Sequence, residues 1–510
     1  MATPHALQGT PVLVVGAGIM GAGIAQVAAQ AGQPVLLFDT RAGAAADAKT
    51  KLGAGLDALV AKGKFNADAV AATLARIEPV ASLDAAAPAR LVVEAIVENV
   101  DAKRTLFQQL EAIVADDCVL ATNTSSISVT AIANGLQQPQ RLVGMHFFNP
   151  VPQMKLVEVV SGLRTAPGVA GAIFELSKAW GKVPVHARST PGFIVNRIAR
   201  PYYAEALALL HEQATTPPVL DACLRGAGFR MGPCELMDLI GHDTNFAVTQ
   251  SVYEAFFYDK RFAPSPVQRE LVDGGLLGRK SGQGFYTYPA AATAPLANTP
   301  WPRPTCTDGV VVHGSGPLAD WLAATAQTTL ELHAARATRQ RDSRWVGIAV
   351  GAAKLVRTDG RSANELAAAL AGGEVAVFDF PAVLPAPPGT ALAFAMADAA
   401  SEAWRTQAPA WLAALGFAPR EVADTPGLLV ARTLAMLINE AADAVQQGVC
   451  TAEGANAAMK LGVNYPEGPF EWLARWGTGG VIGVLQALDA VYRGERYRVS
   501  PWLQRKAALR

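Results

Sequence analysis

The chain has 510 residues, of which 43 are Lys or Arg and 43 are Asp or Glu, so its formal net charge is zero. Nucleic-acid-binding proteins and polybasic membrane-surface proteins normally carry a basic excess, and the balance argues against both. With 51% hydrophobic and 17% charged residues, the chain is expected to be folded rather than disordered. At roughly 100–200 residues per domain, its length predicts three or four domains.

The five cysteines are scattered through the sequence, and no two have CxxC spacing. Neither a disulfide framework nor a metal site is therefore expected. The first ten residues lack the basic and apolar regions of a signal peptide, and no apolar stretch reaches the roughly 20 residues of a membrane span. We expect a cytoplasmic α/β protein without a membrane or nucleic-acid partner.

A glycine-rich turn follows the first apolar segment of the chain. Residues 11–15 are typical of a buried parallel strand, and they lead directly into the sequence GAGIMG. Gly16 permits a tight turn, Gly18 lets the backbone approach a pyrophosphate, and Gly21 lets the next helix pack on the strand. The start of that helix would offer free N–H groups to phosphates. The residues expected to bind a cofactor here are Gly16, Gly18, Ile19, Met20 and Gly21.

An acidic residue ends the second expected strand, at residues 34–38. The carboxylate of Asp39 can accept hydrogen bonds from both ribose hydroxyls, which favours NAD over NADP. Arg41 complicates this interpretation because a nearby Arg can serve a 2′-phosphate, and we interpret it as packing on adenine or as solvated. Strand, turn, helix and acid together predict NAD binding, and the alternative is a purely structural glycine turn.

Four more apolar segments alternate with helical stretches and predict a doubly wound, Rossmann-type parallel sheet. They span residues 91–95, 118–122, 142–145 and 155–160. Because ligands bind beyond the carboxyl ends of such strands, polar residues at these ends are site candidates.

One histidine and one glutamate stand out among these candidates. His146 lies at a strand end, and Glu158 interrupts an otherwise apolar strand. A buried carboxylate is costly without a partner, and a His–Glu pair would supply one. Glu158 would fix the imidazole tautomer and stabilise the imidazolium, so that His146 acts as a general base. The alternative is a core histidine and an unrelated edge glutamate.

The segments HFFNPVPQMKLVEVV and STPGFIVNR, with the glycine turn and its acidic residue, resemble those of the L-3-hydroxyacyl-CoA dehydrogenases. The resemblance covers about residues 8–290. It implies that His146 takes the proton of the 3-hydroxyl while C3 gives hydride to nicotinamide. Glu158 would hold the base, and Ser125 and Asn196 would hydrogen-bond the substrate oxygens. The resemblance also implies contacts to the nicotinamide half of NAD or to the base from Glu98, Lys103, Asn123 and Asn149.

The same resemblance implies an acyl-CoA substrate. Coenzyme A would lie near the helix after Asp39, where four lysines cluster. Of these, Lys62 or Lys64 is expected to contact a CoA phosphate. Without the resemblance, the cluster would be interpreted as a solvated face.

The second half of the chain resembles a shortened copy of the first. A constant offset of 235 residues relates matching segments, as for Pro191 and Pro426. Asn196 becomes Ala431 in the copy, and an alanine cannot hydrogen-bond a substrate. Residues 310–319 read as a strand and a glycine turn that has lost its third glycine, and no histidine motif follows. We therefore predict a Rossmann remnant that binds no NAD.

The expected architecture is a Rossmann-type sheet and an all-α domain, followed by degenerate copies of both. The expected ranges are an NAD-binding domain at 8–188, a helical substrate domain at 189–288, a linker at 289–308, a degenerate Rossmann-like domain at 309–423 and a second helical domain at 424–510. Helical domains of this family usually pair to form dimers. We expect a homodimer, or a monomer in which the two helical domains pair within the chain.

Chains of this length with two helical C-terminal domains resemble the branch of the family that serves bacterial phenylacetate breakdown. This implies 3-hydroxyadipyl-CoA as substrate, with Arg200, Arg230 and Arg261 as candidate partners of its distal carboxylate. The alternatives within the class are 3-hydroxybutyryl-CoA or a broad short-chain range. Further alternatives are a gulonate 3-dehydrogenase-like enzyme and a non-catalytic NAD-binding protein, and a complete catalytic set argues against the latter.

Overall fold

The computed structural model describes residues 7–289, 300–305, 309–331 and 337–509. The chain divides into two compact units. The first consists of Met1–Arg197 and Ala444–Val463, and the second of Ile198–Asp443 and Asn464–Arg510. Most of the linker expected at 289–308 lies outside the described residues, and Cys306 lies there with it.

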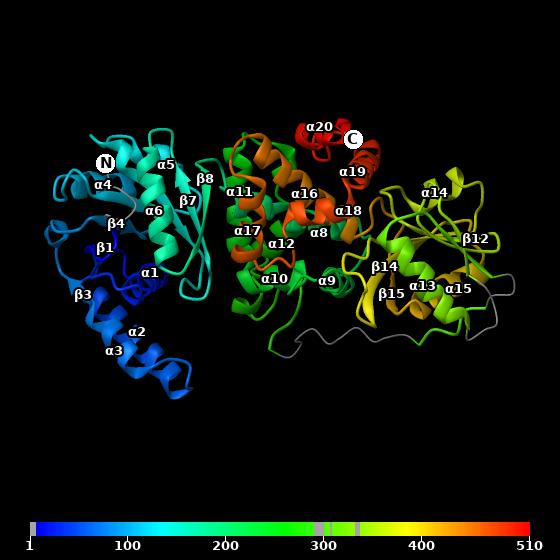
Figure 1. Cartoon of the computed structure of the whole chain (residues 1–510), viewed down its shortest axis with the longest axis horizontal. Helices are drawn as coiled ribbons and strands as arrows, with labels where there is room; N and C mark the ends of the chain where they lie inside the picture. The colour runs from blue at the N-terminus through cyan, green and yellow to red at the C-terminus, as the bar shows by residue number, and fades with distance from the viewer. Residues whose placement is uncertain (1–6, 290–299, 306–308, 332–336, 510) are drawn as a thin grey trace. The chain divides into compact units, whose positions relative to one another are not determined.

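An eight-stranded sheet forms the centre of the first unit (Figure 1), with the strand order β3-β2-β1-β4-β5-β6-β7-β8. All neighbouring strands are parallel except β6 and β7, which are antiparallel. The strands are β1 (Val12–Val15), β2 (Val35–Phe38), β3 (Ile77–Val80), β4 (Leu91–Glu94), β5 (Val119–Thr122), β6 (Leu142–Phe147), β7 (Leu156–Ser161) and β8 (Val183–Arg188). The helices of this unit are α1 (Ile19–Gln30), α2 (Ala44–Ala61), α3 (Ala67–Ala75), α4 (Val100–Glu111), α5 (Val129–Ala133), α6 (Pro167–Ala179), α7 (Val195–Ile198) and α17 (Ala452–Gly462).

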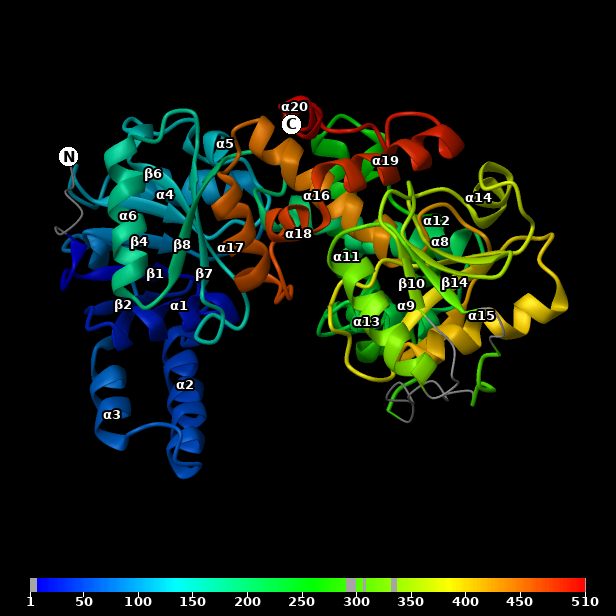
Figure 2. The ribbon, with the colours of Figure 1, turned by 45° about the vertical axis from the view of Figure 1, so that its right-hand side comes forward.

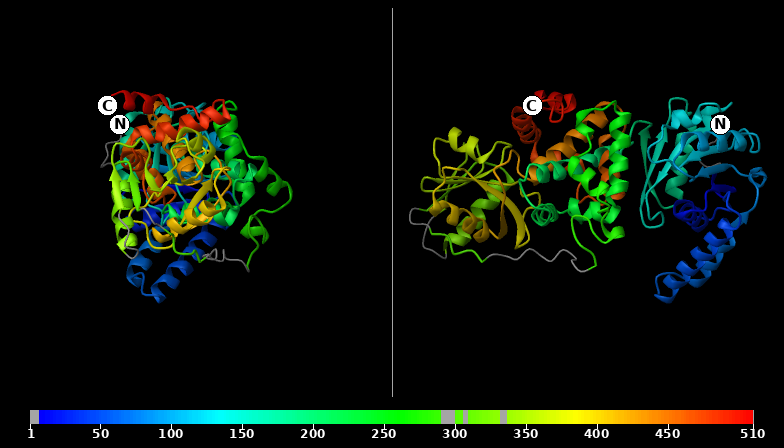
Figure 3. Two further views of the ribbon diagram at one scale, coloured as in Figure 1. Left: turned by 90° about the vertical axis from the view of Figure 1, so that its right-hand side faces the viewer. Right: turned by 180° about the vertical axis from the view of Figure 1, so that it is seen from behind.

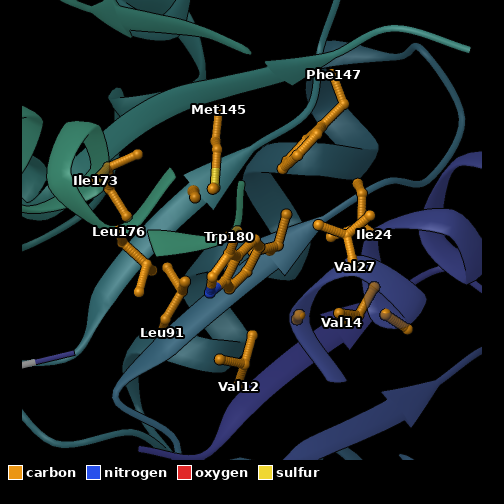
Figure 4. Packing of buried hydrophobic residues seen from close by; sticks show 14 of the residues in the cluster. Val12, Val14, Ile24, Val27, Leu91, Met145, Phe147, Ile173, Leu176 and Trp180 are labelled. Atoms are coloured by element: carbon orange, nitrogen blue, oxygen red, sulfur yellow. The ribbon is translucent and has the colours of Figure 1, made fainter. Parts of the chain in front are cut away.

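The core of the first unit joins the central strands to α1 and α6 (Figure 4). Val12 and Val14 from β1 meet Ile24 from α1, and all three side chains are fully buried. Burying a side chain of this size contributes about 1.5–3 kcal/mol. Helices therefore cover β1 and the strands beside it, as a parallel sheet requires, and the short β-branched run forms a buried strand.

Helices α2 and α3 form a hairpin that projects from the first unit (Figure 2). The turn between them carries Lys62 and Lys64, both exposed. Asn66 begins α3 because its side-chain oxygen accepts the N–H groups of Asp68 and Ala69. The sequence interpretation had placed a helix after Asp39 but not the hairpin.

The second unit contains the remaining helices of both helical copies and a second sheet (Figure 3). Its helices are α8 (Arg200–His211), α9 (Pro217–Gly226), α10 (Pro233–Ile240), α11 (His242–Ala255), α12 (Pro266–Asp273), α13 (Pro317–Glu331), α14 (Ala363–Ala369), α15 (Glu402–Ala414), most of α16 (Val430–Gln446), α18 (Pro469–Trp476), α19 (Thr478–Tyr492) and α20 (Pro501–Ala508). The sequence from Ile194 to His211 suggests one long helix, but in the structure α7 ends at Ile198 and α8 begins at Arg200. Pro201 has no N–H to continue the α7 hydrogen-bond ladder.

The second sheet has the order β10-β9-β11-β12-β13-β14-β15. Its strands are β9 (Val310–His313), β10 (Ala337–Gln340), β11 (Gly347–Val350), β12 (Ala353–Arg357), β13 (Val375–Phe378), β14 (Thr390–Met396) and β15 (Phe417–Glu421). Strand β9 leads through Gly314 and Gly316 into α13, as the sequence predicted. However, β11 runs antiparallel to β9, whereas β4 runs parallel to β1 in the first sheet.

Each sheet is covered by a helix from the other helical copy. In the first unit, α17 of the second copy packs on β7 and β8, and Arg188 N donates to Val449 O over 2.9 Å. In the second unit, α9 of the first copy packs on β14, and Ala423 N donates to Ala214 O over 2.9 Å. These two hydrogen bonds are equivalent, because both residues of one are offset by 235 positions from their counterparts in the other.

Ion pairs between the two helical copies repeat in the same reciprocal way. Within the second unit, Arg261 of the first copy lies 3.2 Å from Glu440 of the second. Arg496 of the second copy lies 2.8 Å from Glu205 of the first, and these residues have the same 235-residue offset. Reciprocal contact of equivalent residues is the mark of a two-fold, isologous interface. The helical copies therefore pair within one chain in the manner of a dimer.

Candidate active site

The glycine turn after β1 has the geometry that its sequence predicted. Gly16 has φ of 102°, and a Cβ on it would lie 2.5 Å from Ala95 O. A Cβ on Gly21 would lie 1.7 Å from Gly16 O, so only glycine lets α1 approach the turn. Gly18 faces open space, and no side chain caps the α1 N-terminus that it begins. The turn therefore leaves room and donor groups for a phosphate.

Asp39 closes the other side of the turn. Its Oδ2 accepts the N–H of Ala17 at 2.8 Å, and its Oδ1 accepts the N–H of Arg41 at 2.9 Å. Arg41 itself lies 3.5 Å from the exposed Asp47. Ile19 at the start of α1 is 79% exposed. This arrangement of residues fits the adenosine and pyrophosphate parts of NAD.

His146 and Glu158 are partners across the antiparallel strands β6 and β7. The two residues are in register, and His146 Nδ1 lies 2.6 Å from Glu158 Oε2. His146 is 5% exposed and Glu158 is fully buried. With Nδ1 engaged, Nε2 is the ring nitrogen left for a substrate. The geometry is that of a base held in one tautomer by a carboxylate.

The second oxygen of Glu158 anchors the chain at the start of α7. Glu158 Oε1 accepts the N–H groups of Ile194 and Val195 at 3.1 and 2.9 Å. This carboxylate therefore joins β7 to the segment that carries Asn196. Phe193, at φ of 45°, and Phe148 pack their rings beside the imidazole, with ring centroids 5.8 and 4.4 Å from that of His146.

A cavity of about 360 Å³ opens in front of the imidazole. Among the residues predicted for the site, it is lined by Met20, Glu98, Lys103, Asn123, Ser125, His146, Asn149 and Asn196. Asn123 Oδ1 accepts the N–H of Phe147, and Asn196 Nδ2 donates to Ser125 O over 3.4 Å. Residues from four strand ends thus converge on one space, although the sequence separates them widely.

Glu98 organises the Thr124–Ser126 turn at one wall of this cavity. Its Oε1 accepts hydrogen bonds from Thr124 Oγ1 at 2.7 Å and from Ser125 N at 2.9 Å. Burial opposes ionisation of this carboxyl, but Lys103 and the hydrogen bonds outweigh burial and lower the pKa of Glu98. Glu98 is therefore a carboxylate at neutral pH.

Lys103 is buried between two carboxylates. Its Nζ lies 2.6 Å from Glu94 Oε1 and 3.2 Å from Glu98 Oε2. The role of Glu94, which also accepts from Thr122 Oγ1, was missed by the sequence interpretation. The signal was present, because Glu94 ends an apolar strand just as Glu158 interrupts one.

Several other candidates lie elsewhere. Lys62 and Lys64 do not line the cavity. Arg261 pairs with Glu440 and Asp443 in the second unit and does not line this cavity. Among the described residues, no cluster has the composition of a metal site, and no helix is long and apolar enough to cross a membrane.

The second sheet has lost the dyad but kept one of its contacts. Asp379 follows β13 at the position of His146, and it pairs with Ala393 at the position of Glu158. Asp379 Oδ2 accepts the N–H groups of Leu429 and Val430 at 2.9 and 2.6 Å. These groups lie 235 residues after the two that Glu158 accepts. Both sheets therefore have a carboxylate that anchors this segment, and only the first pairs it with an imidazole.

Family comparisons cover most of the chain. Residues 11–190 match the 3-hydroxyacyl-CoA dehydrogenase, NAD binding domain. Residues 192–288 and again 427–510 match the C-terminal domain of the same family. Residues 355–426 match the 3-hydroxybutyryl-CoA dehydrogenase reduced Rossmann-fold domain. The duplicated helical domain and the reduced second sheet expected from the sequence are thus confirmed.

The chain is 44% identical over 499 residues to the 3-hydroxyadipyl-CoA dehydrogenase of Escherichia coli K12, covering 98% of this chain and 97% of that one. It is 43% identical over 276 residues to a probable 3-hydroxybutyryl-CoA dehydrogenase of Deinococcus radiodurans, covering 54% and 99%. A crystal structure of a 3-hydroxybutyryl-CoA dehydrogenase from E. coli K12 matches with a TM-score of 0.88 at 42% identity, covering 98% of both chains. The chain therefore belongs to the 3-hydroxyacyl-CoA dehydrogenase family, whose members are NAD-dependent oxidoreductases.

Proposed function

We propose that this dehydrogenase oxidises (3S)-3-hydroxyadipyl-CoA to 3-oxoadipyl-CoA, with His146 as the general base. The observation that carries the proposal is the 2.6 Å contact between His146 Nδ1 and Glu158 Oε2 beside a cavity lined by Ser125 and Asn196. The cavity distinguishes this pair from His242 and Asp238, which are fully buried 2.8 Å apart and do not line it.

His146 Nε2 takes the proton of the substrate 3-hydroxyl as the C3–H bond breaks. Bound NAD supplies the hydride acceptor, held by the Gly16–Gly21 turn and Asp39. Glu158 stabilises the imidazolium that forms, and its bonds to Ile194 and Val195 keep it in place. Ser125 and Asn196 orient the substrate oxygens, so that the hydroxyl faces the base.

Glu98 and Lys103 act on the site through other groups. Glu98 accepts hydrogen bonds from the N–H and the hydroxyl of Ser125, and so fixes the turn that carries Ser125. Lys103 neutralises Glu98 and Glu94. The exposed Lys62 and Lys64 at the tip of the α2–α3 hairpin serve CoA phosphates as mobile cations.

The choice of a dicarboxylyl-CoA rests on the similarity of nearly the whole chain to the E. coli 3-hydroxyadipyl-CoA dehydrogenase. The E. coli structure that matches the whole chain is described as a 3-hydroxybutyryl-CoA dehydrogenase, so the two substrates must be compared directly. NADH formation is measured with 3-hydroxyadipyl-CoA, 3-hydroxybutyryl-CoA and L-gulonate. The highest kcat/KM is expected for 3-hydroxyadipyl-CoA. A preference for 3-hydroxybutyryl-CoA would reject the substrate, and turnover of L-gulonate alone would reject the class.

A further inference from the structure

Helix α17 comes from the second helical copy, yet it packs in the first unit against the strand that carries Glu158 (Figure 2). Cys450, just before α17, lies near the same strand. Burial raises the pKa of the Cys450 thiol to about 12, and the neighbouring charge of Glu158 contributes to that rise. A segment of the second copy therefore packs beside the strand that carries Glu158 of the proposed catalytic dyad.

Gly462 ends α17 where it meets this strand. A Cβ on Gly462 would lie 2.7 Å from Leu156 Cδ2 and 3.0 Å from Val195 Cγ2, closer than carbon atoms pack. It would also lie 3.8 Å from Phe148 Cε1. The three neighbours belong to the segments that hold the dyad.

Each neighbour has a direct link to a catalytic group. Leu156 begins β7, two residues before Glu158. Val195 N donates to Glu158 Oε1 over 2.9 Å. The ring of Phe148 lies 4.4 Å from the imidazole of His146. A displacement at Gly462 would therefore reach both members of the dyad.

Space, and not backbone conformation, explains the glycine. Gly462 does not have the positive φ that favours glycine elsewhere in this chain. Alanine in a helix is more favourable than glycine by about 1 kcal/mol. A glycine at this position is therefore locally costly, and what it gains is the close approach of α17 to Leu156 and Val195.

We propose that Gly462 is a positioning residue for the oxidation, through which the second helical copy sets the distance between His146 and Glu158. The inference rests on the proposed role of this dyad. Within the described residues, the second half of the chain contributes no side chain to the cavity. Through Gly462 it would still have a part in catalysis.

The chain contains a matched control. Gly226 ends α9, which packs on β14 of the second sheet. A Cβ on Gly226 would lie 2.6 Å from Ala391 O and 3.1 Å from Thr390 Cγ2, at the start of β14. Gly226→Ala therefore crowds a strand of the sheet that lacks the dyad, and its nearest atom is a backbone oxygen instead of a side-chain methyl group.

The test compares Gly462→Ala with Gly226→Ala in the full chain, using the 3-hydroxyacyl-CoA that the wild type turns over best. For Gly462→Ala we expect kcat to fall about tenfold or more, because misplacement by 1 Å can cost 100-fold. The acid limb of the kcat/KM profile should shift to lower pH, because a looser Glu158 stabilises the imidazolium less. The NAD dissociation constant should not change. For Gly226→Ala we expect loss of thermal stability with unchanged kcat and pH profile.

A second variant removes the conflicting atom. Leu156→Val lacks Cδ2, so the double variant Leu156→Val/Gly462→Ala should recover part of the lost kcat. The double variant also keeps the test possible if Gly462→Ala alone folds poorly. The proposal is overturned if Gly462→Ala keeps wild-type kcat and pH profile, if Gly226→Ala shows the same kinetic loss, or if the double variant recovers stability without recovering kcat. If His146→Ala retained full turnover, the dyad itself would be rejected, which is a separate result.

Discussion

His146 and Asp379 occupy equivalent positions on the two sheets. Comparing them distinguishes the contacts that anchor the chain from the contact that holds the imidazole. In the first sheet Glu158 both holds the imidazole and accepts the N–H groups that begin α7. In the second, Asp379 accepts the equivalent N–H groups of Leu429 and Val430 directly. A buried carboxylate at this junction thus anchors the chain in both copies, and only in the first sheet does a carboxylate also hold an imidazole.

Lys103 offers a test of the buried charges beside the cavity. Lys103→Met leaves Glu94, which is fully buried, without its cation. Removing one partner of a buried ion pair costs about 3–5 kcal/mol, and we expect a loss of that order in urea unfolding. The control is Lys178→Met, which breaks an exposed pair with Glu175 and should cost less than about 1 kcal/mol. Equal losses in the two variants would contradict the structural role of Lys103.

At the residue scale, the sequence predicted site residues where a residue interrupts a regular pattern. Glu158 was found because it interrupts an apolar strand, and the glycine turn because its spacing is tied to close backbone approaches. Asp379 could not be placed, because its alignment with His146 depends on strand register and not on a constant offset. Gly462 gave no signal, because its close contacts are with residues distant in sequence.

The antiparallel strand β11 is the element that distinguishes the two sheets most clearly. In the first sheet the carboxyl ends of β1 and β4 lie side by side, and dinucleotides bind at such a point. In the second sheet, β11 runs antiparallel to β9, so the carboxyl end of β11 lies beside the amino end of β9. His313 at the end of β9 stacks on Trp345, with ring centroids 4.1 Å apart.

We therefore expect one NAD per chain. Isothermal titration of the purified protein with NAD should give a stoichiometry of one. Gly21→Ala, whose Cβ would collide with Gly16 O, should abolish this binding and leave no residual site. A second NAD per chain, or a site that survives in Gly21→Ala, would show that the second sheet still binds the cofactor.

Asp379 makes the stability of the second unit depend on pH. Burial raises the pKa of Asp379 to about 6, although four backbone N–H groups favour its charged form. An unfolded Asp titrates near 3.9, so between about pH 4 and pH 6 the folded state binds more protons than the unfolded state. The contribution of this group therefore weakens as pH rises through that window, by roughly 2 kcal/mol.

Asp379→Asn mimics the protonated group and lacks this titration. The difference in unfolding free energy between Asp379→Asn and the wild type should shift in favour of the variant by roughly 2 kcal/mol from pH 4 to pH 6.5. Urea unfolding at several pH values measures it. A difference that stays constant with pH, or one that shifts towards the wild type, would mean that the N–H groups outweigh burial.

Element prediction was accurate for the strands and weaker for the helices. The apolar segments 91–95 and 118–122 correspond to β4 and β5, because buried strands have continuous apolar sequences. The break between α7 and α8 was missed, although Pro201 marks it. The antiparallel direction of β11 was not predictable, because a short apolar run does not encode strand direction.

At the scale of the whole molecule, the duplication brings both sides of a reciprocal interface between the helical copies into one chain. Arg432 pairs with the fully buried Glu205 and with the exposed Glu212, and its guanidinium donates to the hydroxyls of Tyr492 and Tyr497. The equivalent arginine of the first copy, Arg197, donates to Gln447. One chain therefore supplies both sides of these contacts.

Arg432 tests the contribution of this interface to stability. Arg432→Met removes a fully buried guanidinium and should cost about 3–5 kcal/mol in urea unfolding, since Glu205 and Glu212 lose a cation. Arg269→Met breaks an exposed pair with Asp273 and serves as the control, with an expected cost below about 1 kcal/mol. If Arg432→Met costs no more than the control, pairing of the helical copies does not depend on these charges.

We infer that one dyad in the first sheet carries the chemistry of the whole chain. The decisive measurement is the rate of NADH formation by His146→Ala with saturating NAD and 3-hydroxyacyl-CoA. Loss of a general base lowers the rate by about 100- to 10,000-fold, and we predict a loss in this range with NAD still bound. Turnover within a few-fold of the wild type would contradict the assignment of His146 and with it the account of the two halves.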